Sequence, residues 1–362
     1  MDKILVAAVV GATASGKSAL AVEIARRYGG TVINADSMQV YSDIEIATAQ
    51  PTTEERRGVP HKLFGFRSPA EPFSVCEYVE IAHRAIRAAA GQGSLPVVVG
   101  GSGLYVDSLL DGYNFAKSNT DFEERAAFRA KYTSFAQENG VSALHEILQS
   151  VDSQSAAVIH ENNVKRVIRA LESSLLDGIS INEAKRQSRL SDSPYHVLRV
   201  SLDMPREKLY ERINERTDLM INMGLIDEAA RFFAKYGVTS ARQKDDTTVT
   251  FDNFVNVSDR SETQNFHNML STSVQAIGIK ELEKYLSGKE SLNEAVLRIK
   301  QATRNFAKRQ ITWFGKDARI YKFLHCDFGK NDGLYKELDT LFKNVLKLKD
   351  KNGILIGKGG CL

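Results

Sequence analysis

The stretch "ILVAAVVGATASGKS", residues 4–18, decides how the rest of the chain is interpreted. Its first half is apolar and predicts a buried strand, and its second half matches the phosphate-binding loop pattern G-x-x-x-x-G-K-[ST]. Gly11 and Gly16 let the backbone turn so that its N–H groups face phosphate oxygens. Lys17 supplies a positive charge, and Ser18 offers a hydroxyl to a divalent metal. The predicted diphosphate-binding residues are Gly11, Ala12, Thr13, Ala14, Ser15, Gly16, Lys17 and Ser18.

Composition places the chain among globular proteins. Its 362 residues are 43% hydrophobic and 26% charged, enough for one large domain or two to three smaller ones. The net charge of +3 does not by itself establish a nucleic-acid partner. The three cysteines are far apart and form no CxxC, which favours reduced thiols in a cytoplasmic protein over a disulfide framework or a zinc site. No apolar run approaches the ~18 residues of a membrane span, so we expect no membrane partner.

Strands and helices alternate in the first hundred residues. The predicted strands are 3–10, 31–34 and 95–99, and the predicted helices are 17–28 and 73–93. This alternation predicts an α/β fold with a P-loop NTPase-like parallel sheet flanked by helices. Loops that follow parallel strands share one edge of the sheet. The phosphate loop should therefore meet two further segments in one crevice, at Asp36–Tyr41 and Gly100–Tyr105.

The pattern changes near residue 115, where helices without strands begin. We predict a helical insertion domain at 115–199 within a core domain formed by 1–114 and 200–328. The core should include a returning strand at 197–203, a helical stretch at 206–237 broken at Gly224, and a long helix at 291–314. Residues 240–268 are polar and predict an extended or mobile loop, and the C-terminal tail 329–362 shows little pattern.

Two segments after strands carry candidate polar groups with open interpretations. The Asp36 carboxylate could accept a proton from a substrate or orient metal-bound water, or it could simply stabilise a turn. The glycines of "GGSGLY", residues 100–105, could allow close packing or the close approach of a substrate. In the second case Ser102 and Tyr105 would be the polar contacts.

Two helical segments carry clusters of basic residues. The helix at 291–314 places Lys300, Arg304 and Lys308 in one stripe, and "KRVIR" at 165–169 gathers three cations on another helix. Such stripes are usually solvated faces, but two of them beside a phosphate loop indicate a second anionic ligand, with a nucleic-acid backbone as one candidate. The residues assigned to the apolar face of the first helix are Ile299, Ala302, Phe306 and Trp313.

Eight short motifs occur in a specific order along the chain. They are "GATASGKSALA", "NADSMQVY", "IATAQP", "GVPHKL", "VVVGGSGLYVDSLL", "RVIRALE", "QAIGIKEL" and "FAKRQITWF". Together they resemble tRNA dimethylallyltransferases, also called tRNA isopentenyltransferases or the IPP transferase family, from about residue 4 to 315. The zinc finger of eukaryotic members is absent, which favours the bacterial type. Departures include Gln50 and Ala47, where the family usually has lysine and glycine.

The resemblance implies a prenyl transfer to RNA. The expected reaction moves the dimethylallyl group of dimethylallyl diphosphate to N6 of the adenosine 3′-adjacent to the anticodon, position 37, in tRNAs reading codons that begin with U. The products would be N6-isopentenyladenosine and diphosphate. The nucleotide-binding loop would then hold the diphosphate of the prenyl donor rather than ATP, with Mg²⁺ near Ser18. The expected partners are the tRNA anticodon stem-loop and the donor, and we expect a monomer.

The resemblance also implies roles for individual residues. Asp36 should accept a proton from the adenine N6 amine, Lys17 should offset the charge of the leaving diphosphate, and Thr13 should contact the donor. Residues matching the tRNA contacts of the family are Asp36, Ser37, Met38, Gln39, Ser102, Arg125, Lys165, Arg166, Val167, Ile168 and Arg169, to which the basic stripe adds Arg304 and Lys308.

Three other functions share some of these features. An ATP-dependent phosphotransferase would carry an identical loop. A prenyltransferase acting on free AMP, ADP or ATP would need no insertion of about 85 residues, because a mononucleotide pocket is only roughly 300–1,000 Å³. A tRNA-binding protein without activity would keep the basic helices but would not need Lys17 and Asp36.

Overall fold

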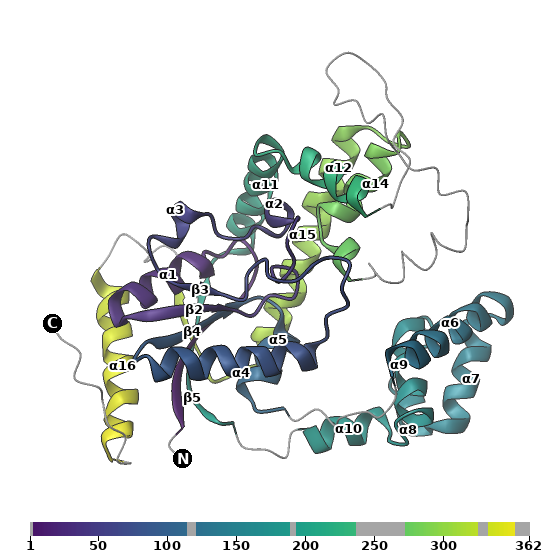
Figure 1. Cartoon of the computed structure of the whole chain (residues 1–362), viewed down its shortest axis with the longest axis horizontal. Coiled ribbons are helices and arrows are strands. Elements are labelled where there is room, and N and C mark those ends of the chain that lie inside the picture. The colour runs from purple at the N-terminus through teal and green to yellow at the C-terminus, as the bar shows by residue number, and fades with distance from the viewer. Residues whose placement is uncertain (1–2, 114–120, 189–192, 237–271, 325–331, 352–362) are drawn as a thin grey trace. The chain divides into compact units, whose positions relative to one another are not determined.

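The computed structural model describes residues 3–113, 121–188, 193–236, 272–324 and 332–351 (Figure 1). The predicted loop at 240–268 lies outside the described residues. The chain divides into two compact units, one formed by 1–109 with 195–362 and the other by 110–194.

The first unit is built on a six-stranded parallel sheet of order β3-β2-β4-β1-β5-β6, which confirms the predicted α/β fold. Every β1 residue from Leu5 to Val10 is buried, as expected for a strand covered on both faces. The strands are β1 Ile4–Val10, β2 Gly30–Asn34, β3 His61–Lys62, β4 Leu95–Gly100, β5 Tyr195–Asp203 and β6 Ile320–Leu324.

Helices of this unit begin and end at recognisable capping residues. Capping boxes start α4 (Val75–Gly91) at Ser74 and α15 (Leu292–Phe314) at Ser291. The predicted break at Gly224 is confirmed, because its φ of 98° ends one helix and begins the next. The other elements are α1 Lys17–Tyr28, α2 Glu45–Thr48, α3 Thr53–Arg56, α5 Gly103–Leu110, α11 Arg206–Asn222, α12 Leu225–Lys235, η1 Ser273–Gln275 and α14 Ile279–Leu286.

A C-terminal helix, α16 (Asp332–Lys351), covers part of the core and lies beside α1 in Figure 1. The sequence pattern gave no expectation of it. Leu334, Leu338 and Phe342 join the core cluster formed by α1 and the sheet. The Phe342 ring stacks on Tyr28 with centroids 4.2 Å apart, and the Tyr28 hydroxyl donates to Asp339. The tail is therefore part of the folded core through residue 342.

The second unit is helical, with its own apolar core. Its helices are α6 Phe122–Asn139, α7 Val141–Val151, α8 Ser153–Ala156, α9 Val164–Leu175 and α10 Ile181–Ser188. The predicted insertion, 115–199, extended too far at its C-terminal end, because β5 begins at Tyr195 and pairs with Ile4 of β1. Residues 195–199 therefore belong to the core sheet.

We expect Leu338→Ala to lower the free energy of unfolding by about 2–5 kcal/mol, because it removes a fully buried side chain between α16 and the sheet. Urea unfolding followed by circular dichroism measures the change, with Glu337→Ala on the exposed side of the same helix as control. Equal stability of the two variants would show that α16 does not form part of the cooperative core.

Candidate active site

The register of the sheet brings three loops to one edge. Val10 at the end of β1 is paired with Gly100 on one side and Ser201 on the other, and Asn34 of β2 is paired with Val99. The strands are parallel, so their carboxyl ends coincide. The loops after β1, β2 and β4 therefore meet, as the sequence predicted.

The loop after β1 has the backbone of a phosphate cradle. Gly11 and Gly16 have φ of 135° and 92°, a region that favours glycine, and Ala14 is left-handed at 61°. Helix α1 starts at Lys17, so its first N–H groups and the positive end of its dipole face the loop. The Ser15 hydroxyl is buried and has no hydrogen-bond partner among the described residues. The loop thus offers several unsatisfied donors to an anion.

Lys17 is a cation with no carboxylate in contact among the residues that the structure describes. Its Nζ makes one long hydrogen bond, 3.5 Å, to the Ala12 carbonyl. Burial lowers the pKa of Lys17 to about 8, although the negative charge of Asp36 opposes this and the charge of Arg216 adds to it. A bound diphosphate would restore the ordinary protonation of this lysine.

Two arginines of α11 also reach the loop. Arg212 Nε donates to the Ala14 carbonyl at 2.9 Å, and Arg216 Nη1 donates to the Thr13 hydroxyl at 3.4 Å. Burial holds the pKa of Arg216 below its ordinary value, and the charges of Glu55 and Asp36 only partly compensate. These arginines were missed in the sequence, although their spacing of four residues places both on one helix face.

Gln310 of α15 joins two of the loops and was also missed. Its side chain is buried, with Oε1 accepting from the Thr13 N–H at 2.8 Å and Nε2 donating to the Gly101 carbonyl at 2.9 Å. A Cβ on Gly101 would lie 2.1 Å from Nε2, and one on Gly100 would lie 2.2 Å from the Ala35 carbonyl oxygen. The glycines of this loop therefore serve close packing.

Asp36 is held by buried polar groups beneath it. The fully buried Asn34 accepts from the Asp36 N–H at 2.8 Å and donates to the Asp36 carbonyl at 3.1 Å, and Tyr78 donates to the Asn34 carbonyl. Asp36 Oδ1 accepts from the Met38 N–H at 3.0 Å. Stabilising the turn thus uses one carboxylate oxygen of Asp36, Oδ1, and leaves Oδ2 available. Its geometry is therefore compatible with a turn-stabilising residue and with a proton acceptor.

The neighbours of Asp36 link the β2 and β4 loops. The Ser102 hydroxyl accepts from the Ser37 N–H at 2.9 Å and lies 3.0 Å from the Ser37 hydroxyl. Gln39 Nε2 donates to two carbonyls, of Thr48 and Ala49, and so holds its own loop. Tyr105, expected as a polar contact in one interpretation, is instead mostly buried, with its ring 4.5 Å from that of Tyr78.

The basic stripe of α15 is less free than the sequence suggested. Lys300 forms an ion pair with Asp218 at 2.6 Å, and Arg304 donates to Asn214 on α11 at 2.7 Å. Lys308 is exposed, and no side chain pairs with its ammonium group in the described parts of the chain. Trp313, predicted on the apolar face, is 48% exposed.

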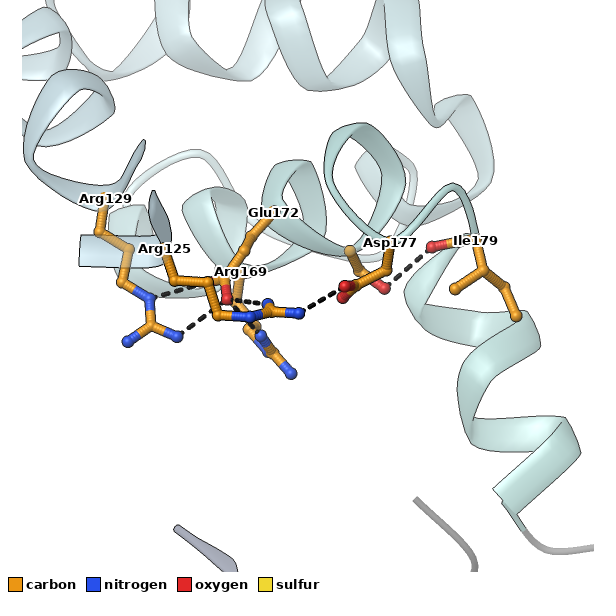
Figure 2. A network of polar contacts seen from close by, with 7 residues as sticks. Arg125, Arg129, Arg169, Glu172, Asp177 and Ile179 are labelled. Carbon is orange, nitrogen blue, oxygen red and sulfur yellow. Dashed lines mark hydrogen bonds and ion pairs between the residues drawn. The ribbon is translucent and has the colours of Figure 1, made fainter. Parts of the chain in front are cut away.

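The second unit concentrates arginines around one buried carboxylate, Glu172 (Figure 2). Arg125, Arg129 and Arg169 all donate to Glu172, and Arg125 also pairs with Asp177. Burial alone would raise the pKa of Glu172, but the hydrogen bonds from Arg129 and Arg125 and the charge of Arg169 outweigh it and hold the pKa below its ordinary value. Arg125, predicted to contact tRNA, is mostly buried in this network.

The segment 165–169 separates into two kinds of residue. Lys165, Arg166 and Arg169 are exposed on α9, whereas Val167 and Ile168 are buried in the core of the unit. The prediction of RNA contacts therefore has to be corrected for the side chains of Val167 and Ile168. They are buried because α9 packs an apolar face against the core of the unit.

A metal at this site would rely on the ligand for most of its coordination. Within the described residues no group of three or more His, Cys, Asp or Glu side chains could hold a metal ion. Ser18 lies exposed in the first turn of α1, next to the cradle. Mg²⁺ commonly combines one or two protein oxygens with phosphate oxygens and water, so these residues fit a diphosphate-bound Mg²⁺.

Comparison with known proteins matches the chain to two family models. Residues 39–317 match the family described as IPP transferase, and residues 4–64 match isopentenyl transferase. The chain belongs to the IPP transferase family. A tRNA dimethylallyltransferase of Carboxydothermus hydrogenoformans is 40% identical over 89% of this chain and 91% of its own. A tRNA dimethylallyltransferase of Halalkalibacterium halodurans is 38% identical over 95% of this chain and 98% of its own.

Solved structures of the family have the same fold. The full-length tRNA isopentenylpyrophosphate transferase of Bacillus halodurans superposes with a TM-score of 0.64 at 36% identity, covering 96% of this chain and 99% of that one. A eukaryotic dimethylallyltransferase acting on tRNA superposes with a TM-score of 0.72 at 24% identity, covering 98% of this chain and 81% of that one. This likeness supports the fold. Among the described helices, none combines the length and apolar character needed to cross a membrane.

We expect the affinity for inorganic diphosphate to fall as the pH rises through about 8, by up to about tenfold per unit. The unliganded protein loses the Lys17 proton there, so above this pH binding must take up a proton. Calorimetry from pH 6.5 to 9.5 measures the change. Lys17→Arg is the control, since arginine stays charged and diphosphate titrates equally with both proteins. Parallel pH profiles would contradict the assignment.

We expect Gln310→Leu to weaken diphosphate binding and to lower the free energy of unfolding by about 1–3 kcal/mol, because the Thr13 N–H and the Gly101 carbonyl lose their partner. Calorimetry and urea unfolding measure the two effects. Gln301→Leu, on the exposed side of α15, makes the same change without touching the loops. Identical behaviour of the two variants would exclude a bridging role for Gln310.

Proposed function

We propose that the chain transfers the dimethylallyl group of dimethylallyl diphosphate to N6 of adenosine 37 in tRNAs that read codons beginning with U. The observation that carries the proposal is the proximity of Asp36 to a cationic phosphate cradle. Its carboxylate is close enough to act electrostatically on both Lys17 and Arg216. A proton acceptor thus lies beside a diphosphate site, as transfer to an amine requires.

The cradle supplies the binding and activation of the donor. The backbone of the phosphate loop, Lys17 and Arg216 surround the position of a diphosphate near Thr13. Charge builds on this group as the allylic C–O bond breaks, so cations fixed beforehand stabilise the transition state more than the ground state. Mg²⁺ held by the diphosphate and Ser18 would neutralise part of the same charge.

Asp36 supplies the base. The adenine N6 lone pair forms a bond to the allylic carbon, the C–O bond to diphosphate breaks, and the proton of N6 passes to Asp36 Oδ2. General-base catalysis of this kind contributes about 10²–10⁴ in rate. The Asn34 hydrogen bonds and the Met38 N–H hold the carboxylate in a fixed orientation, so little reorganisation is needed at the moment of transfer.

The adenine must leave the anticodon stack to reach Asp36, as in other enzymes that modify a base. Unpaired loop nucleotides allow this at a lower cost than paired ones. The exposed Lys165, Arg166 and Arg169 of the second unit are candidates for contacts to the RNA backbone. The reaction is proposed for a monomer acting in the cytoplasm, and light scattering of the purified protein tests the first of these statements.

The test is to incubate the protein with unmodified tRNA and dimethylallyl diphosphate, digest the RNA and weigh its nucleosides. We expect an adenosine that carries one prenyl group. A parallel arm replaces the donor with ATP. Consumption of ATP on a small acceptor, with no prenylated nucleoside in the first arm, would overturn the proposal in favour of a phosphotransferase.

We expect Asp36→Asn to reduce the single-turnover rate at least about 100-fold while tRNA binding stays within about twofold, because the acceptor is lost and the shape is kept. Rapid quench and filter binding measure the two quantities. Asp227→Asn changes an exposed aspartate on α12 and should leave both unchanged. A full rate in Asp36→Asn would refute the base assignment.

A further inference from the structure

Trp313 is an aromatic side chain in an unusual position. It lies at the last turn of α15 with 48% of its surface exposed, although its neighbour Phe314 is buried. It is also the only tryptophan of the chain. Large aromatic side chains bury most of their surface when packing decides their position, so this exposure requires another explanation.

The indole is held in one orientation. Its Nε1 donates to Asp107 Oδ2 of α5 at 2.8 Å. Asp107 forms an ion pair with Arg199 at 3.6 Å, and the buried Arg199 also pairs with Asp317 at 2.8 Å. The carboxylate that accepts from the indole is therefore itself held by a buried arginine, which ties the ring to the folded core. The ring is thus both exposed and rigid.

The position of the ring depends on a glycine. A Cβ on Gly103 would lie 2.4–2.5 Å from three ring atoms of Trp313. The indole therefore occupies the space that any other residue at 103 would fill, and lies directly against the backbone at the start of α5. The exposed part of the ring faces away from this backbone.

Trp313 borders the candidate active site. Gly103 follows Ser102, whose hydroxyl accepts from Ser37 next to Asp36. Gln310, one turn earlier on α15, holds the phosphate loop and the β4 loop together. Trp313 and the proposed base are therefore both tied to the loop after β4.

Two cations stand near Trp313 in sequence, and the guanidinium of one of them, Arg309, lies over the Phe306 ring, 5.5 Å from its centroid. Arg309 lies four residues before Trp313 on the same face of α15, and Lys316 follows three residues after it. Both are exposed, and in the described parts of the chain neither is paired with a carboxylate. An exposed, held aromatic ring with exposed cations on the same segment of chain is suited to unpaired nucleotides, which proteins hold by stacking on the base and by charge on the backbone.

We propose that Trp313 is a stacking platform for an unpaired base of the tRNA anticodon loop and holds the loop while the target adenine enters the site. This inference rests on the proposed function. It makes Trp313 a binding residue for RNA, which touches neither the diphosphate nor the allylic carbon.

Because Trp313 is the only tryptophan, the intrinsic fluorescence of the unmodified protein reports on this ring alone. We expect an anticodon stem-loop RNA to quench it, whereas a blunt duplex of the stem sequence and dimethylallyl diphosphate alone do not. Absence of quenching by a bound stem-loop would overturn the proposal. Quenching by the donor alone would overturn it equally, because the ring would then face the donor.

Variants give a second measurement. We expect Trp313→Leu to weaken stem-loop binding roughly 5- to 150-fold, the range for loss of one stacked base, with the salt dependence of binding unchanged. Trp313→Phe should recover most of the affinity because it keeps an aromatic face. Tyr321→Leu removes an exposed aromatic from β6 and serves as the matched control. Equal loss in the Phe and Leu variants would contradict stacking.

Two controls separate the possible failures. Melting temperature and diphosphate binding of each variant show whether it is folded, and the fluorescence experiment needs no variant at all. Prenylation of tRNA by the unmodified protein is measured first. If prenylation occurs and the stem-loop does not quench Trp313, only the stacking proposal fails. If no prenylation occurs, the proposed function itself fails.

Discussion

The pairing of β1 with β4 on one side and β5 on the other is the constraint on which the site depends. Val10 is the last residue of β1 and lies in register with Gly100 and Ser201, so the chain leaves neighbouring strands at the same height. A shift of one residue would turn the phosphate loop away from the β4 loop and separate Thr13 from Gly101. Gln310 can bridge these two residues only in this register.

The site contains polar groups that the fold itself does not satisfy. In the part of the chain that the structure describes, Lys17 has no carboxylate in contact and the Ser15 hydroxyl has no partner, while the partly buried Arg216 makes a long hydrogen bond of 3.4 Å to Thr13. Each of these costs stability in the unliganded protein, because burial with a long hydrogen bond or none disfavours polar and charged groups. The apolar core, which includes residues of α16, contributes the folding free energy that offsets this cost. A bound diphosphate would satisfy all three groups together.

How much the sequence could predict depends on the range of the interactions. Strands β1, β2, β4 and β5, helix α1 and the break at Gly224 follow from local patterns, whereas β3 and β6 were not predicted. The crevice follows from the rule that the loops after parallel strands lie at the same end of the sheet. Gln310, Arg216 and Trp313 were missed or misplaced, because their functions arise from contacts with residues more than 200 positions away in sequence. The packing of Leu338 was missed for the same reason, since the tail shows little local pattern that reveals its partner.

The strand order has a consequence for synthesis on the ribosome. β1 is made first, but β5, one of its two partners, is made only after the entire second unit. At about 5–20 residues per second, the edge of β1 that pairs with β5 stays unpaired for on the order of 10 to 40 s. The helical unit between them has its own core and mainly local contacts, so it can fold during this interval. The nascent chain thus exposes an apolar strand edge for longest at its most buried strand, which makes this interval the one in which a chaperone would matter most.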